Sequence, residues 1–88
     1  MKTNGTTIDP DAYAAWVVPR IGSEVMRLRE SCGLSAYALA RMARVSDQTI
    51  LNLEQGHGDQ GCMTATLARI CACLGTTVFA LMAAAEER

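Results

Sequence analysis

The sequence predicts an all-α fold of five or six short helices, with two of them joined by a tight turn near the centre. Apolar residues recur at helical spacing along most of the chain, with capping residues before the apolar segments and glycines after them. No segment alternates apolar and polar residues for long enough to form a sheet. With 88 residues, half of them hydrophobic, the chain can bury one small core.

The first helix is predicted over residues 10–18. Asp9 followed by Pro10 is typical of a helix start, because the carboxylate accepts from unpaired amides and proline suits the first helical position. Trp16 in this helix either packs on the chain's own core or anchors a contact with another subunit. Pro19 should end the helix and open the next, since a proline inside a helix removes a hydrogen bond and crowds the preceding turn.

Two serine caps and two glycine stops mark boundaries of the next three helices. They are predicted over 19–32, 36–43 and 46–55, with caps at Ser35 and Ser46 and stops at Gly33 and Gly56. The residues expected to face the core share helical spacing: Ile21, Val25, Leu28, Cys32, Leu39, Ala40, Ala43, Ile50 and Leu53.

A glycine-rich loop, HGDQGC, is expected from His57 because it has no periodicity. Another helix should begin near Thr64 and end at Gly75, and a last one should begin at Thr76 or Thr77. Their inward residues are predicted to be Leu67, Ile70, Cys71, Leu74, Val78, Leu81 and Met82.

Composition favours a soluble, cytoplasmic protein. No apolar segment approaches the roughly 20 residues that span a bilayer, and the N-terminus has no signal-like region. We expect a flexible N-terminal arm over 1–8 and a single domain over 9–88. The net charge of −1 argues against nucleic-acid binding, but the acidic and basic residues are unevenly placed. Acids gather near the ends, and the central arginines are Arg20, Arg27, Arg29, Arg41, Arg44 and Arg69.

Neither a metal, a cofactor nor an active site is expected. Cys71 and Cys73 are two residues apart in a helical segment, whereas structural zinc sites use a wider spacing, so the four cysteines are interpreted as reduced thiols, and a redox role stays open. His57 is the single histidine and has no acid or base partner in a defensible arrangement; Cys62 nearby is not a persuasive nucleophile. An enzyme is the weakest of the possible readings.

The central segment resembles the XRE family of helix-turn-helix regulators, the Cro and lambda-repressor class. The resemblance covers about residues 21–75 and rests on the pattern Leu39-Ala40, Val45-Ser46, Ile50, Leu53, Glu54 and Gly56. It implies a lambda-repressor-like DNA-binding domain. It also implies that Arg29 pairs with Glu54, which would tie the helix over 19–32 to the helix after Ser46 through a bidentate guanidinium.

The resemblance implies that the helix after Ser46 enters the major groove of DNA. Asp47, Gln48 and Asn52 then match positions that meet base edges, and Ser46 or Thr49 could touch phosphate. Gln48 or Asn52 could bond adenine, while Asp47 could accept only from a cytosine amino group or repel phosphate. The alternative is a solvated helix face on which Ser46 and Asp47 only cap the helix. The DNA-binding candidates are Ser46, Asp47, Gln48, Thr49, Asn52, Arg44, Tyr37 and His57.

Three departures from the family pattern bear on the expected contacts with DNA, and two of them remove contacts with phosphate. Ala36 stands where a glutamine often bonds phosphate, and the following loop is about two residues longer, lacks lysine and arginine, and carries Asp59. Arg44 replaces a common glycine in the turn, so the backbone there either adopts a left-handed conformation at some cost or turns differently. His57 either bonds phosphate, better when protonated, or is solvated.

We therefore expect a regulator, most simply a repressor, that binds double-stranded operator DNA as a homodimer. The competing hypothesis is an antitoxin-like protein-interaction module. Its partner protein would bind the apolar segments around Trp16 or residues 78–82. Copurification with a second protein would separate the two hypotheses.

Overall fold

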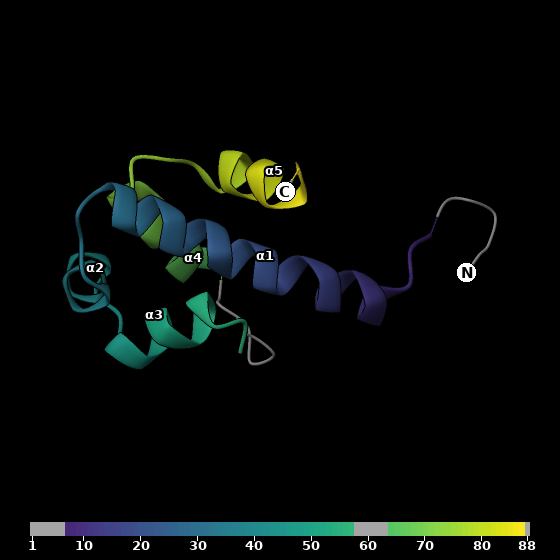
Figure 1. Cartoon of the computed structure of the whole chain (residues 1–88), viewed down its shortest axis with the longest axis horizontal. Helices are drawn as coiled ribbons and strands as arrows, with labels where there is room; N and C mark the ends of the chain where they lie inside the picture. The colour runs from purple at the N-terminus through teal and green to yellow at the C-terminus, as the bar shows by residue number, and fades with distance from the viewer. Residues whose placement is uncertain (1–6, 58–63, 88) are drawn as a thin grey trace.

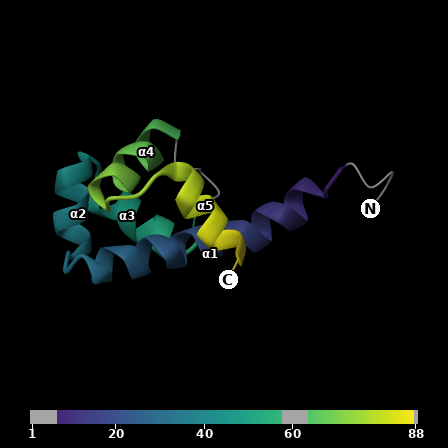
Figure 2. The same cartoon turned by 90° about the horizontal axis from the view of Figure 1, so that it is seen from above.

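The computed structural model describes residues 7–57 and 64–87, and these form five helices and no strand. The helices are α1 (Pro10–Ser31), α2 (Ala36–Ala43), α3 (Asp47–Glu54), α4 (Thr64–Cys73) and α5 (Val78–Glu87). Helix α1 crosses the molecule with α5 on one side and α3 on the other, and α4 lies behind it in the view of Figure 1 (Figures 1 and 2). The N-terminal end of α1 extends beyond the other helices in both views (Figures 1 and 2). The all-α prediction is confirmed.

All five helices contribute to one hydrophobic core, and most of the predicted core residues lie in it. Its buried members are Val25, Leu39, Ala40, Ala43, Ile50, Leu53, Leu67, Ile70, Cys71, Leu74 and Leu81. Ile21, Leu28, Val78 and Met82 pack against them and are partly buried. Cys32 is exposed, so its predicted place in the core is wrong. It forms the C-cap of α1, where the chain turns out of the helix.

Pro19 neither ends a helix nor begins one, and that prediction is wrong. Helix α1 is 22 residues long, from Pro10 to Ser31, and Pro19 lies in its interior. A proline removes one hydrogen bond from a helix interior, at a cost of about 3 kcal/mol for an isolated helix. Tertiary contacts on both sides offset this cost: Val17 is buried, and the Arg20 Nε donates to the Ala85 carbonyl oxygen of α5 at 3.0 Å.

Four helices end in the same backbone motif, in which one residue turns left-handed and the next amide donates back to a carbonyl in the last turn. Glycine provides the left-handed residue after α1, α3 and α4. At the end of α2 the corresponding residue is Arg44, at φ 62°. The predicted caps at Asp9, Ser35 and Ser46 are present, each accepting from amides of the first helical turn.

In the described parts of the chain, no single helix has the length and apolar character needed to cross a bilayer. That criterion is met only by α4 and α5 taken together, and these two are bent by 88° relative to each other.

Candidate nucleic-acid interface

Helix α3 is tied to α1 by the pair expected between Arg29 and Glu54. The Arg29 Nε donates to Glu54 Oε2 at 2.7 Å, and its Nη2 donates to Oε1 at 3.0 Å. The Glu54 side chain is 1% exposed and that of Arg29 12%. Hydrogen bonding to Glu54 raises the pKa of Arg29. A third bond, from Nη1 to the Leu34 carbonyl oxygen at 2.8 Å, also fixes the segment before α2.

Gly22 brings α1 and α3 into direct backbone contact. It is buried, and a Cβ atom added to it would lie 2.0 Å from the Leu53 carbonyl oxygen and 3.0 Å from the Leu53 carbonyl carbon. Only glycine fits at this crossing. The sequence signal was a glycine inside a helical pattern, which carries a cost of about 1 kcal/mol and often has a packing reason.

The turn between α2 and α3 takes the left-handed conformation, which is one of the two predicted for it. Arg44 has φ 62° and ψ 48°, and the Val45 amide donates to the Ala40 carbonyl oxygen at 2.9 Å. Helix α4 supports the turn, because the Arg69 Nε donates to the Ala43 carbonyl oxygen at 2.9 Å. Helix α1 therefore holds α3 directly at Glu54, whereas α4 holds the last residue of α2, just before the turn into α3.

Replacing Arg44 by glycine should stabilise the protein by about 1 kcal/mol, because the left-handed conformation costs other residues about 1–2 kcal/mol. The melting temperature should rise by about 4–8 °C for a domain of this size. Thermal unfolding followed by circular dichroism measures this. Arg44→Ala is the matched control, since it removes the same charge and keeps the strain. Equal stabilisation by both variants would show that the backbone strain is not the cause.

The exposed face of α3 carries the polar residues predicted to meet DNA, and four of them are joined in two pairs. The Ser46 Oγ and Thr49 Oγ1 lie 2.8 Å apart, and the Gln48 Nε2 donates to Asn52 Oδ1 at 2.8 Å. Asn52 and Thr49 are partly buried, whereas Gln48 is exposed. The two amide side chains thus restrain each other one helical turn apart and still have hydrogen-bonding groups to offer.

Tyr37 lies on the exposed face of α2 next to Arg41. Tyr37 is one of the predicted DNA-binding residues, and Arg41 is not. The Arg41 Nη1 donates to the Tyr37 hydroxyl at 2.7 Å, and the guanidinium carbon lies 5.4 Å from the centre of the ring. His57 is exposed directly after α3, and its amide donates to the Asn52 carbonyl oxygen at 2.8 Å. Residues 58–63 of the predicted loop, including Asp59 and Cys62, lie outside the described residues.

Most of the central arginines bond carboxylates or carbonyls of the same chain. Arg29 and Arg27 bind the buried carboxylates of Glu54 and Glu24, and Arg20 and Arg69 donate to backbone carbonyls. Within the described residues, neither Arg41 nor Arg44 bonds a carboxylate or a backbone carbonyl through its side chain, and both are exposed. Of the six arginines, these two lie in α2 and its following turn, immediately before α3.

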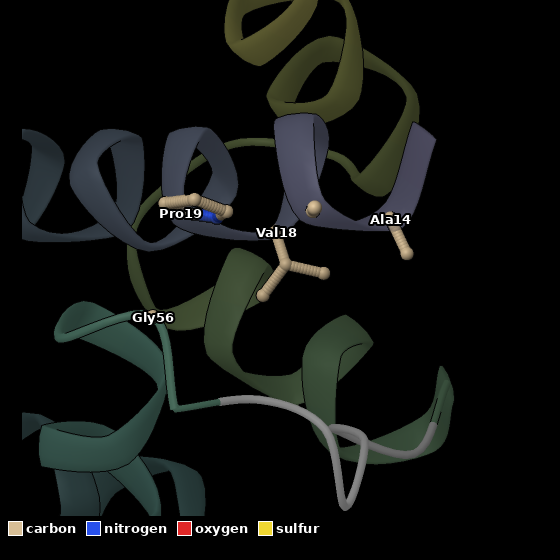
Figure 3. Close-up of a pocket in the computed structure, with 5 residues that line it drawn as sticks. Ala14, Val18, Pro19 and Gly56 are labelled. Carbon is tan, nitrogen blue, oxygen red and sulfur yellow. The ribbon is translucent and has the colours of Figure 1, made fainter. Parts of the chain in front are cut away.

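The described residues offer no arrangement for catalysis or metal binding. They contain no group of three or more histidine, cysteine, aspartate or glutamate side chains suited to a metal ion. A pocket between α1 and the end of α3 is lined, in the part that the structure describes, by Ala14, Ala15, Val18, Pro19 and Gly56. Figure 3 shows Val18 projecting from α1 on the side of the Gly56 turn. None of these residues carries a nucleophile, an acid or a base.

Comparisons with known proteins agree with this geometry. A family model described as helix-turn-helix matches residues 25–81. Two crystal structures of the clp gene regulator ClgR from Corynebacterium glutamicum resemble the fold with TM-scores of 0.74 and 0.73, each at 25% sequence identity. Both cover 81% of this chain, which in turn covers 73% and 88% of the respective ClgR chains. No curated protein matches the sequence.

Proposed function

The chain belongs to the XRE family of helix-turn-helix regulators, which bind DNA and are not enzymes, and from this premise we propose that it is a repressor that acts as a homodimer on operator DNA. A repressor needs only to occupy a promoter. The ClgR structures are titled as those of a gene regulator, which supports a role in transcription.

The observation that carries the proposal is the paired polar face of α3, held in place by the Arg29–Glu54 bridge. We propose that Gln48 and Asn52 meet base edges, because amide side chains both donate and accept as adenine requires. Ser46, Thr49, Tyr37, Arg44 and His57 would contact the sugar–phosphate backbone.

A dimer is supported by the small number of cationic groups near α3. Each phosphate contact contributes to affinity through counterion release, so a single copy with few such contacts binds weakly. Two copies on paired half-sites add their contacts and double the number of base contacts. Arg41 and Arg44 are the arginines best placed to supply the phosphate contacts.

Replacing Gln48 and Asn52 together by alanine should lower the affinity for specific DNA about 100-fold, since each lost base contact weakens discrimination by about 1–3 kcal/mol. Fluorescence polarisation against DNA from upstream of the protein's own gene, at two salt concentrations, measures this. The wild-type affinity should fall as salt rises. Sedimentation of the complex gives the number of chains bound.

The matched control replaces two exposed serines of α1, Ser23 and Ser31, by alanine and should leave the affinity unchanged. If the Gln48 and Asn52 double variant binds as tightly as the wild type, these residues are not the reading face. A single chain bound to the full site would contradict the homodimer.

A second candidate is an antitoxin-like module with a partner protein, and an exposed aromatic favours it. Phe79 at the start of α5 is 83% exposed. Trp16 is 43% exposed although the Arg20 guanidinium lies 4.5 Å from the centre of its ring, so it packs partly on its own chain. Copurification of a second protein with the wild type, but not with Phe79→Ser, would support this candidate.

A further inference from the structure

Asp47 differs from the other polar residues on the exposed face of α3. Ser46 pairs with Thr49, and Gln48 pairs with Asn52. No hydrogen bond or ion pair of the Asp47 carboxylate occurs among the described residues, and the side chain is exposed. Asp47 is also the first residue of α3. In the part of the chain that the structure describes, Asp47 is therefore the one charged side chain on this face, and both of its carboxylate oxygens are free to accept.

We propose that Asp47 reads a cytosine in each half-site of the operator. This inference rests on the proposed function, and it names the base that one residue of the reading face selects. In helix-turn-helix proteins the N-terminal residues of the second helix contact base edges in the major groove. Asp47 holds that position here, and its short side chain keeps the carboxylate close to the helix.

The chemistry of the base edges decides which base a carboxylate accepts. An ionised carboxylate can only accept hydrogen bonds. In the major groove, cytosine presents its N4 amino donor, guanine presents two acceptors, and thymine presents an acceptor and a methyl group. Adenine has an N6 donor, but its N7 acceptor lies beside it and repels the second carboxylate oxygen. Cytosine is the base that satisfies Asp47 without such a repulsion.

The position of Asp47 also limits the electrostatic cost of placing an acid near DNA. The N-terminus of a helix carries a partial positive charge, which favours a carboxylate in the first turn. Phosphates repel the Asp47 carboxylate whichever bases lie in the half-site. A hydrogen bond from a cytosine amino group offsets this repulsion, whereas guanine and thymine offer no donor and adenine places an acceptor beside its donor. A half-site without cytosine at this position should accordingly bind worse than one with it.

The test is selection of binding sites from a pool of DNA duplexes randomised at their central positions, followed by affinity measurements on single-base variants. We expect the wild-type chain to prefer cytosine at one position of each half-site by about tenfold. Asp47→Ala should lose that preference. Asp47→Asn should move it to adenine, because an amide donates to N7 and accepts from N6.

Asp11→Asn is the matched control, since Asp11 lies in the first turn of α1 and the substitution makes the same change in charge. It should keep the preference for cytosine. If both Asp47 variants select the same half-site as the wild type, the inference is wrong, and the role of Asp47 is limited to stabilising the N-terminus of α3. If the folded wild-type chain selects no sequence from the pool, the proposed function is wrong and the inference falls with it.

Discussion

Replacing Arg29 by alanine should lower the free energy of unfolding by about 3–5 kcal/mol, because it leaves the buried Glu54 carboxylate without its cation. Glu54 is 1% exposed at its side chain and receives two hydrogen bonds from Arg29. Small domains have about 5–15 kcal/mol of stability in total, so the loss would leave a large unfolded population. Urea denaturation followed by circular dichroism measures it.

A double-mutant cycle separates the pair from the loss of either side chain alone. Replacing Arg29 by methionine together with Glu54 by leucine removes both charges and should be more stable than Arg29→Ala, since buried ion pairs can be replaced by apolar residues of similar volume. Glu87→Ala removes an exposed glutamate of α5 and should change stability by less than about 0.5 kcal/mol. Strictly additive effects of the single variants Arg29→Met and Glu54→Leu would show that the bridge contributes no coupling energy.

Replacing Gly22 by alanine should destabilise the protein by about 3 kcal/mol or more. In an exposed helix the same change would stabilise by about 1 kcal/mol. Here the new Cβ would lie 2.0 Å from the Leu53 carbonyl oxygen, and neither backbone can yield without moving α3 away from α1. Chemical denaturation gives the stability, and the DNA titration described above should show a parallel loss of affinity.

Ser23→Ala is the control for this change, because it alters the next residue of α1, which is exposed. It should be neutral or slightly stabilising. If Gly22→Ala unfolds at the same denaturant concentration as the wild type, α1 and α3 do not approach each other as closely as the structure shows.

The helix boundaries were predicted well where local signals set them. Asp9, Ser35 and Ser46 accept hydrogen bonds from the first turns of their helices, as capping residues do, and these contacts lie within three residues along the chain. Pro19 was misjudged for the opposite reason. Its local effect is to break a helix, and what keeps α1 continuous is packing against α5, about 65 residues later.

The candidate site shows the same division between local and distant causes. The Arg29–Glu54 pair was expected from a family resemblance, since nothing in either segment alone indicates its partner. The structural roles of Gly22 and Arg69 were not predicted. Each contacts a backbone carbonyl of another helix, and every residue has such a carbonyl, so the sequence does not indicate which one is contacted. The pairing of Gln48 with Asn52 follows from their spacing of four residues on one helix.

The continuity of α1 has a consequence for how the chain folds during synthesis. The turns around Pro19 lack one helical hydrogen bond and gain their support from the Ala85 carbonyl oxygen, near the C-terminal end of the described chain. Contacts between residues so far apart form only after the intervening chain has been made, and they slow folding. The turns around Pro19 are therefore among the last parts of the chain to acquire their native support, whereas the C-terminal half of α1 can already pack against α3 through Gly22 and Arg29.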